Sequence, residues 1–98
     1  MNKPQELTSL QKKLINLYSN CELEMTPQEF YQKWDVTYEQ IAQICCRSLS
    51  TVRGWFQLGI YTRYPTKNDL RHLALINFLL VHFGQIPQSL KEALGLLI

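Results

Sequence analysis

Residues 38–56 read Tyr-Glu-Gln-Ile-Ala-Gln-Ile-Cys-Cys-Arg-Ser-Leu-Ser-Thr-Val-Arg-Gly-Trp-Phe, and this stretch decides the fold. Ala42 is small enough to let a second helix cross closely, and Val52, ten residues further on, supplies the buried contact of that second helix. Trp55 follows Val52 at helical spacing and closes a small core. The spacing of these small and apolar residues is that of a helix-turn-helix.

The turn between the two helices is predicted at Cys46 and Arg47. Ser48 then stands at the N-cap of the second helix, where its hydroxyl can accept a hydrogen bond from an amide two or three residues on. Position 46 is usually glycine in this motif, because a left-handed backbone is often needed there. A cysteine adopts that conformation at a modest energetic cost.

The stretch 38–56 resembles the helix-turn-helix regulators, in particular the phage repressors and the MerR or excisionase-like proteins. The run Thr66–Leu80 is similar to the helix that follows the wing in MerR-like proteins. The connector Ile60–Pro65 is shorter than the usual wing and lacks its glycine turn, so a stub hairpin or a plain loop is expected. The resemblance implies that the second helix enters the major groove of DNA while the first crosses the backbone.

The composition places this chain of 98 residues among single helical domains. Glycine and proline are sparse, and no alternating apolar run is long enough to demand a sheet. We predict an all-α fold: a compact bundle of about five helices that contains the helix-turn-helix and at most a stub wing. The domain 1–98 divides into N-terminal helices over 1–36, the helix-turn-helix over 37–58, a basic and aromatic connector over 59–66, and C-terminal apolar helices over 67–98.

Capping residues and prolines predict the helix boundaries. Thr37 and Gln40 are spaced as a capping box at the start of the motif, and Glu29 can complete another at the helix that Thr26 opens. Thr66 caps the long C-terminal helix. The predicted helices run from near Gln5 to Ser19–Cys21, from Thr26 onward, from Thr37 onward, from Leu49 to about Leu58, through Leu70–Phe83, and over Gln88–Leu94.

Positive charge is concentrated in one segment, although the chain carries only +2 overall. Residues 1–46 hold four basic and six acidic side chains, whereas residues 47–71 hold five basic side chains against Asp69. The remaining residues hold one of each. The second helix of the motif and the segment after it therefore carry a charge of +4, where phosphate contacts would be made.

Side chains on the outer face of the second helix are the candidates for reading bases. Arg53 can pair with guanine in a bidentate manner and Gln57 with adenine, while Gly54 allows a close approach. The predicted base contacts are Ser50, Arg53, Gly54 and Gln57. The predicted phosphate contacts are Arg47, Ser48, Thr51, Arg63, Lys67 and Arg71. Tyr61 and Tyr64 either accompany these contacts or pack on the core.

The helix Leu70–Phe83 is apolar almost all round, and a surface helix of so small a domain can bury only one stripe. A homodimer that covers the other stripe is therefore expected. Its predicted interface residues are Leu75, Ile76, Leu79, Phe83 and Leu97. The alternative is a monomer in which this helix is the central core helix, wrapped by the N-terminal pair.

Nothing in the sequence points to catalysis. His72 and His82 are ten residues apart on one helix and cannot share a metal ion, and no serine, cysteine or carboxylate has a recognisable general base beside it. The three cysteines lack the paired spacing of a zinc site and are predicted to be buried or half-buried free thiols. The alternative for Cys45 and Cys46 is a redox sensor in the turn. We expect no enzyme activity, cofactor, metal or small-molecule substrate.

No leader and no membrane-spanning run is visible, so a cytoplasmic location is expected. The motif and the charge together predict a protein that binds double-stranded DNA sequence-specifically, as a transcriptional regulator or as an accessory factor of a mobile element. The alternative is a protein–protein interaction module on a helix-turn-helix scaffold without DNA binding. Steep weakening by salt would separate the first function from the second.

Overall fold

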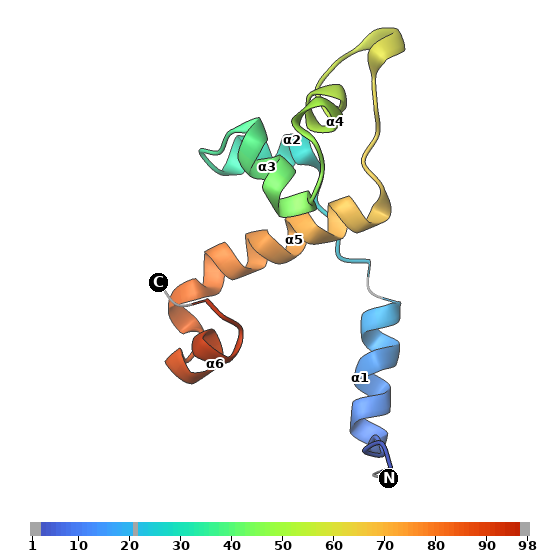
Figure 1. Cartoon of the computed structure of the whole chain (residues 1–98), viewed down its shortest axis with the longest axis vertical. Helices are drawn as coiled ribbons and strands as arrows, with labels where there is room; N and C mark the ends of the chain where they lie inside the picture. Colours follow the sequence, from blue (N-terminus) through green and yellow to red (C-terminus); the bar gives the residue numbers. More distant parts are fainter. Residues whose placement is uncertain (1–2, 21, 97–98) are drawn as a thin grey trace.

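The computed structural model describes residues 3–20 and 22–96. Within these ranges all regular structure is helical, which confirms the predicted all-α fold. Figure 1 shows α2 to α5 gathered into one bundle, with α1 and α6 extending from it on the side away from α4. The elements are α1 (Ser9–Ser19), α2 (Pro27–Lys33), α3 (Tyr38–Cys45), α4 (Leu49–Trp55), the short 3-10 turn η1 (Gly59–Tyr61), α5 (Lys67–His82), a second 3-10 turn η2 (Phe83–Gln85) and α6 (Gln88–Ala93).

Side-chain caps begin the first five α-helices, as the sequence predicts for all but α1. Thr8 and Gln11 form a complete capping box, so α1 begins at Ser9 and not near Gln5. At α2 the Glu29 carboxylate accepts from the Thr26 hydroxyl instead of the backbone amide, and the box is incomplete. The capping residues are Thr8, Thr26, Thr37, Ser48 and Thr66.

The turn between α3 and α4 has a left-handed residue at Cys46, the position where this motif usually has glycine. Cys46 has φ 55° and ψ 44°, and it is the one non-glycine residue with positive φ in the described ranges. The conformation costs roughly 1 kcal/mol for a residue with a side chain. It lets the Arg47 amide donate to the Ala42 carbonyl at 2.9 Å, which satisfies the C-terminus of α3 before α4 begins.

The core lies where α2, α3, α4 and the first half of α5 meet. The predicted contacts Ala42, Val52 and Trp55 are all buried there, which confirms the helix-turn-helix packing. The other buried apolar side chains of this cluster are Phe30, Ile41, Cys45 and Leu73. Burial of these residues from four helices stabilises the bundle.

α4 ends at Trp55, about one turn before the predicted end at Leu58. In a continuing helix the Gly54 carbonyl would accept from the Leu58 amide. Here that carbonyl accepts instead from the Arg63 amide at 2.9 Å, and from the Gln57 amide at 3.4 Å. The residues after Phe56 therefore form an irregular segment, residues 57–65, which we call the connector loop. It contains η1 and no strand among its residues, so of the two expected forms, a stub hairpin or a plain loop, the structure has the plain loop.

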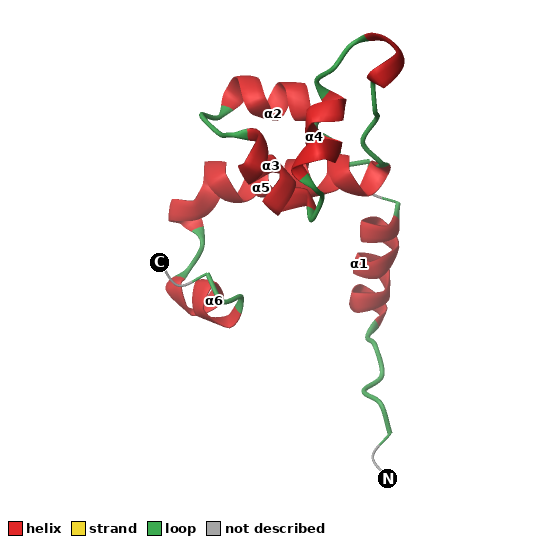
Figure 2. Cartoon of the chain, turned by 45° about the horizontal axis from the view of Figure 1, so that its top comes forward, coloured by secondary structure: helices red, strands yellow, loops and turns green. Residues whose placement is uncertain are grey.

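α5 has two halves with different surroundings. Its first half packs against α3 and α2 and buries Asp69, Leu73 and Ala74. Its second half exposes Phe78, Leu80 and Val81. The alternative of a central helix wrapped by both N-terminal helices is therefore correct only for α2 and the first half of α5, because α1 buries none of its residues. Figure 2 shows α1 and α6 standing apart from the bundle.

Candidate nucleic-acid interface

The outer side of α4 and the connector loop form a groove of about 430 Å³. Ser50, Arg53, Gly54 and Gln57 line it, so the four predicted base contacts lie on one surface. The opposite wall comes from the loop, with Ile60, Tyr61, Thr62 and Arg63. Gln57 lies just after α4 and not on it, but it still lines this groove.

Gly54 is explained by a contact within the chain. The Arg63 side chain covers it so closely that a Cβ at position 54 would lie 2.8 Å from the Cγ and Cδ atoms of Arg63. Gly54 is consequently buried. The space over Gly54 is thus filled by the Arg63 side chain, and a base could contact Gly54 only if that side chain moved.

The other groove residues are accessible and the groove has a positive character. Ser50, Arg53 and Gln57 are exposed, as is Arg63, and no acidic residue lines the groove. Thr62 holds the loop in place, because its hydroxyl donates to the Gln57 carbonyl at 2.9 Å. Two guanidinium groups are therefore presented from two directions, one from the helix and one from the loop.

The tip of the connector loop is strongly exposed and partly apolar. Leu58 and Ile60 expose 93% and 91% of their surface. Tyr61 and Tyr64 are exposed as well, so the alternative that these tyrosines pack on the core is wrong. The apolar tip was not predicted from the sequence, although Leu58 and Ile60 on either side of Gly59 were a signal for it.

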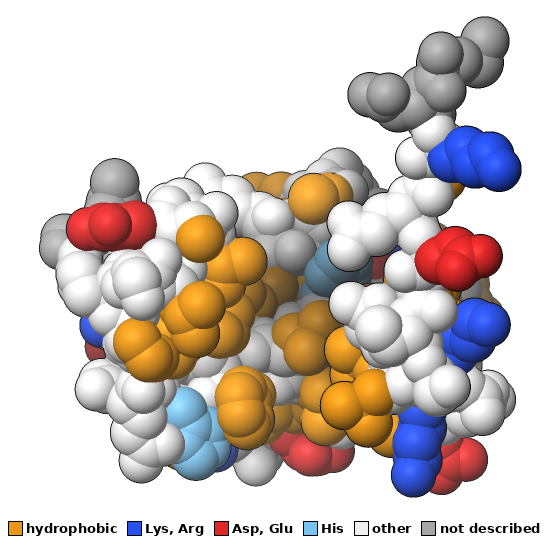
Figure 3. Space-filling model, turned by 90° about the horizontal axis from the view of Figure 1, so that it is seen from below, with side chains coloured by type: hydrophobic (Ala, Val, Ile, Leu, Met, Phe, Trp, Pro, Cys, Tyr) orange, Lys and Arg blue, Asp and Glu red, His pale blue; other side chains and the backbone are white. Residues whose placement is uncertain are grey.

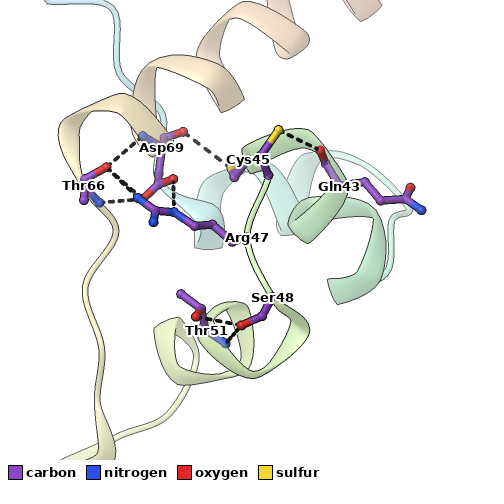
Figure 4. A network of polar contacts seen from close by, with 8 residues as sticks. Gln43, Cys45, Arg47, Ser48, Thr51, Thr66 and Asp69 are labelled. Carbon is purple, nitrogen blue, oxygen red and sulfur yellow. Dashed lines mark hydrogen bonds and ion pairs between the residues drawn. The ribbon is translucent and has the colours of Figure 1, made fainter.

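Arg47, a predicted phosphate contact, is held in an ion pair (Figure 4). Its Nε donates to Oδ1 of Asp69 at 3.0 Å, and its Nη2 donates to Oδ2 at 3.2 Å. Asp69 also accepts from the Thr66 amide at 2.8 Å, within the capping box of α5. The pair joins the turn of the motif to the start of α5. Its signal in the sequence was that Asp69 is the single acid in 47–71.

Asp69 stays ionised despite its burial. Burial acts to raise its pKa, but hydrogen bonds from Arg47 and Thr66 outweigh burial, and the pKa of Asp69 is lowered. The hydrogen bond to Asp69 likewise raises the pKa of Arg47. Arg47 is therefore already paired with a carboxylate, and a phosphate would have to compete with Asp69 for it.

The remaining predicted phosphate contacts have three different surroundings. Ser48 accepts from the Thr51 amide at 3.1 Å, and the two hydroxyl oxygens lie 2.9 Å apart (Figure 4). Lys67 is exposed in the first turn of α5. The Arg71 guanidinium lies 5.2 Å from the ring centroid of Tyr18 and so faces α1 and not the groove. Lys67 and Arg63 are thus the better placed of these cations.

Cys45 and Cys46 are free thiols; Cys45 is buried as predicted, Cys46 is exposed, and Cys21 lies outside the described residues. Cys45 is buried and donates to the Asp69 carbonyl at 3.8 Å. Burial raises the pKa of Cys45 to about 11, with a further contribution from the Asp69 charge. A redox-sensing thiol needs a lowered pKa and access to solvent, so Cys45 does not fit that alternative. Cys46 is exposed, with its Sγ 4.0 Å from the Gln43 carbonyl.

The residues predicted for a dimer interface lie on the far side of α5. Ile76, Leu79 and Phe83 line an apolar groove of about 410 Å³ together with Leu80 and Leu96. Leu75 is exposed but does not line this groove. Leu97 lies outside the described residues.

No protein-family model, curated protein or solved structure matches this chain. In the part of the chain that the structure describes, no helix is long and apolar enough to cross a bilayer. The same residues contain no group of three or more histidine, cysteine or acidic side chains that could hold a metal ion. What the protein does is therefore inferred from the groove itself.

Proposed function

We propose that the protein binds double-stranded DNA sequence-specifically, with α4 in the major groove, and acts as a transcriptional regulator or as an accessory factor of a mobile element. The observation that carries the proposal is the groove in which Arg53 and Gln57 face Arg63 with no acidic side chain between them. Arginine and glutamine pair in a bidentate manner with guanine and adenine, which supplies specificity.

The two walls of the groove suit the two kinds of contact that a duplex offers. With α4 against the base edges, the connector loop would lie beside the adjoining sugar-phosphate strand. Arg63 would then contact a phosphate from the loop, and Lys67 would do so from the start of α5. Ser50 stands near the N-terminal end of α4 and is short enough to reach a base edge or a phosphate.

The charge of one chain favours binding as a homodimer. With Arg63 and Lys67 as phosphate contacts, one chain neutralises about two phosphates, which gives a salt slope near −2. Non-specific attraction of that size is weak at physiological salt. Two copies on a two-fold site would roughly double the slope and place one α4 in each half-site.

Selection of bound sequences from random duplex DNA tests the proposal. We expect enrichment of a motif of two related half-sites, and a salt slope for that motif between about −3 and −5. Lys67→Ala should make the slope shallower by about two units in a dimer, because each copy loses one contact. Absence of any enriched sequence, with binding that is equal on all duplexes, would overturn sequence-specific recognition.

A protein-interaction module is the alternative that the loop tip favours. Leu58 and Ile60 are almost fully exposed, and apolar side chains at a tip can enter a pocket of a partner protein. Such binding would depend little on salt. Ile60→Ser would weaken it, whereas Arg53→Ala would leave it unchanged. The same pair of variants in DNA binding should give the reverse order, with Arg53→Ala the more damaging.

A further inference from the structure

Helix α1 lacks a partner for its apolar face within the described chain. Leu10, Leu14 and Leu17 follow at alternating spacings of four and three residues, and they expose 78%, 65% and 62% of their surface. These three leucines form a stripe of the kind that packs against another helix in a coiled-coil manner. α1 nevertheless buries none of its residues.

A second apolar surface, only partly covered, lies on the same side of the bundle. The half-buried Ile76 and Leu79 of α5 and Phe83 of η2 line an apolar groove, and Leu90 and Leu94 of the α6 region are exposed nearby in the chain. Viewed from below, hydrophobic side chains surround a hollow on this underside (Figure 3). The two surfaces have the same chemistry and neither covers the other.

The chain has a larger accessible surface and a larger radius of gyration than a compact monomer of its length. The chain exposes 8063 Å², whereas a compact folded monomer of its mass would expose about 5,800 Å². Its radius of gyration is 17.0 Å, against about 12.6 Å for a compact domain of this length. The excess of roughly 2,300 Å² per chain, to which residues 3–8 and the connector loop also contribute, is larger than the roughly 1,000 Å² that each subunit of a small obligate dimer buries.

We infer that the occupant of the hollow is α1 of a second copy, and that the two copies form an intertwined dimer by exchanging their α1 helices. In a two-fold arrangement each leucine stripe covers the apolar groove of the other chain, so both surfaces are buried at once. The inference does not rest on DNA binding. α1 and α6 extend away from α4 (Figures 1 and 2), so the exchange leaves both candidate DNA faces open.

A second copy fits the hollow better than the chain's own α1 does. The segment after α1 is attached to the start of α5, because the Met25 amide donates to the Leu70 carbonyl at 3.1 Å. The Tyr18 ring near the end of α1 lies against Arg71, one residue further along α5. These contacts direct α1 away from the second half of its own α5. Folding α1 back onto that half would break the contact between Tyr18 and Arg71.

The mass of the free protein in solution is the first test. In sedimentation equilibrium at micromolar concentration, without DNA, the full chain should have a molar mass of twice 11.5 kDa. Leu14→Asp should weaken the dimer by roughly 30-fold or more, as expected for a central apolar contact. Asn16→Asp adds the same charge on the opposite side of α1 and should leave the dimer unchanged. A monomeric wild-type chain, or an equal effect of the two variants, would overturn the inference.

Cross-linking then separates exchange between chains from closure within one chain. Isotope-labelled and unlabelled proteins are mixed, unfolded and refolded together. An amine-reactive reagent then cross-links Lys12 or Lys13 of α1 to Lys91 of α6. In an exchanged dimer about half of these links should join a labelled to an unlabelled chain. If all such links are within one chain, or if none forms, α1 is not exchanged. Because no DNA is present, this result is independent of whether the protein binds DNA.

Discussion

The Arg63 amide donates a hydrogen bond of 2.9 Å to the Gly54 carbonyl, and the Arg63 side chain covers the face of Gly54. This one relationship ends α4, holds the connector loop against the helix, and places the Arg63 guanidinium in the same groove as that of Arg53. It also accounts for a glycine inside a helix, where the residue costs about 1 kcal/mol relative to alanine.

Gly54→Ala should separate the connector loop from α4. The new Cβ would lie 2.8 Å from two carbons of the Arg63 side chain and 3.0 Å from a third, so Arg63 must shift. We expect faster hydrogen exchange of the Arg63 amide, with the free energy of unfolding changed by less than about 1 kcal/mol because helix propensity improves. Gly84→Ala, where the space around the added carbon is open, is the matched control. An Arg63 amide as protected as in the wild type would show that the loop does not depend on this contact.

Arg53→Ala should reduce specific DNA binding by roughly 1–3 kcal/mol and relax the preference at one base pair. The reason is the loss of a bidentate contact that only one base satisfies. Binding to the selected site and to random duplexes is compared by fluorescence anisotropy. Lys33→Ala removes a positive charge from the last turn of α2, outside the groove, and serves as the control. Equal loss on both duplexes would make Arg53 a phosphate contact.

Asp69→Asn should destabilise the fold by roughly 1–3 kcal/mol at neutral pH, because Arg47 loses an ionised partner and the α5 cap is weakened. The pKa of Asp69 is lower in the folded protein than its ordinary value of 3.8. Its stabilisation is therefore present above that value and is lost as pH falls through the lower, folded pKa. Chemical denaturation at several pH values should show the gap between wild type and variant closing in acid. A gap of constant size, or an equal loss in the exposed Asp35→Asn control, would contradict the assignment.

Cys46 should react with iodoacetamide while Cys45 stays unmodified in the native protein. With a pKa of about 11, only about one Cys45 side chain in a thousand is a thiolate at pH 8, and burial also blocks access. Tandem mass spectrometry locates the label at one residue or the other. Denaturation in urea should expose both thiols, which provides the reference rate. Rapid native labelling of Cys45 would mean that the contact between α3 and α5 opens readily.

Local features of the helix-turn-helix were predictable because they depend on residues three or four positions apart. The caps at Thr37, Ser48 and Thr66 and the left-handed Cys46 all follow from such short-range bonds. The start of α1 also depends on such a short-range bond, but the sequence prediction placed it near Gln5, after Pro4, which was wrong. The capping box between Thr8 and Gln11 defines that start, and Pro4 does not.

The candidate site was predictable only as a set of residues on one side of a helix. Helical spacing placed Ser50 and Arg53 on one face of α4, since one helical face is a property of the sequence, and Gln57 still lines that groove although α4 ends before it. The spacing did not indicate that Arg63 would fill the space over Gly54, or that Arg47 would pair with Asp69, 22 residues away. Both pairings depend on how the loop and α5 return to the motif.

The sequence by itself determined the helical class, the caps and the turn, because hydrogen bonds and side-chain periodicity within a few residues are enough to specify them. The tertiary structure alone decided where α4 ends, which arginines remain available to a ligand, and which half of α5 is buried. Those outcomes follow from contacts between residues far apart in the chain, whose positions are set only when the helices pack. The apolar stripe of α1 illustrates the difference: its spacing predicts a buried face, but the fold of one chain leaves that face exposed.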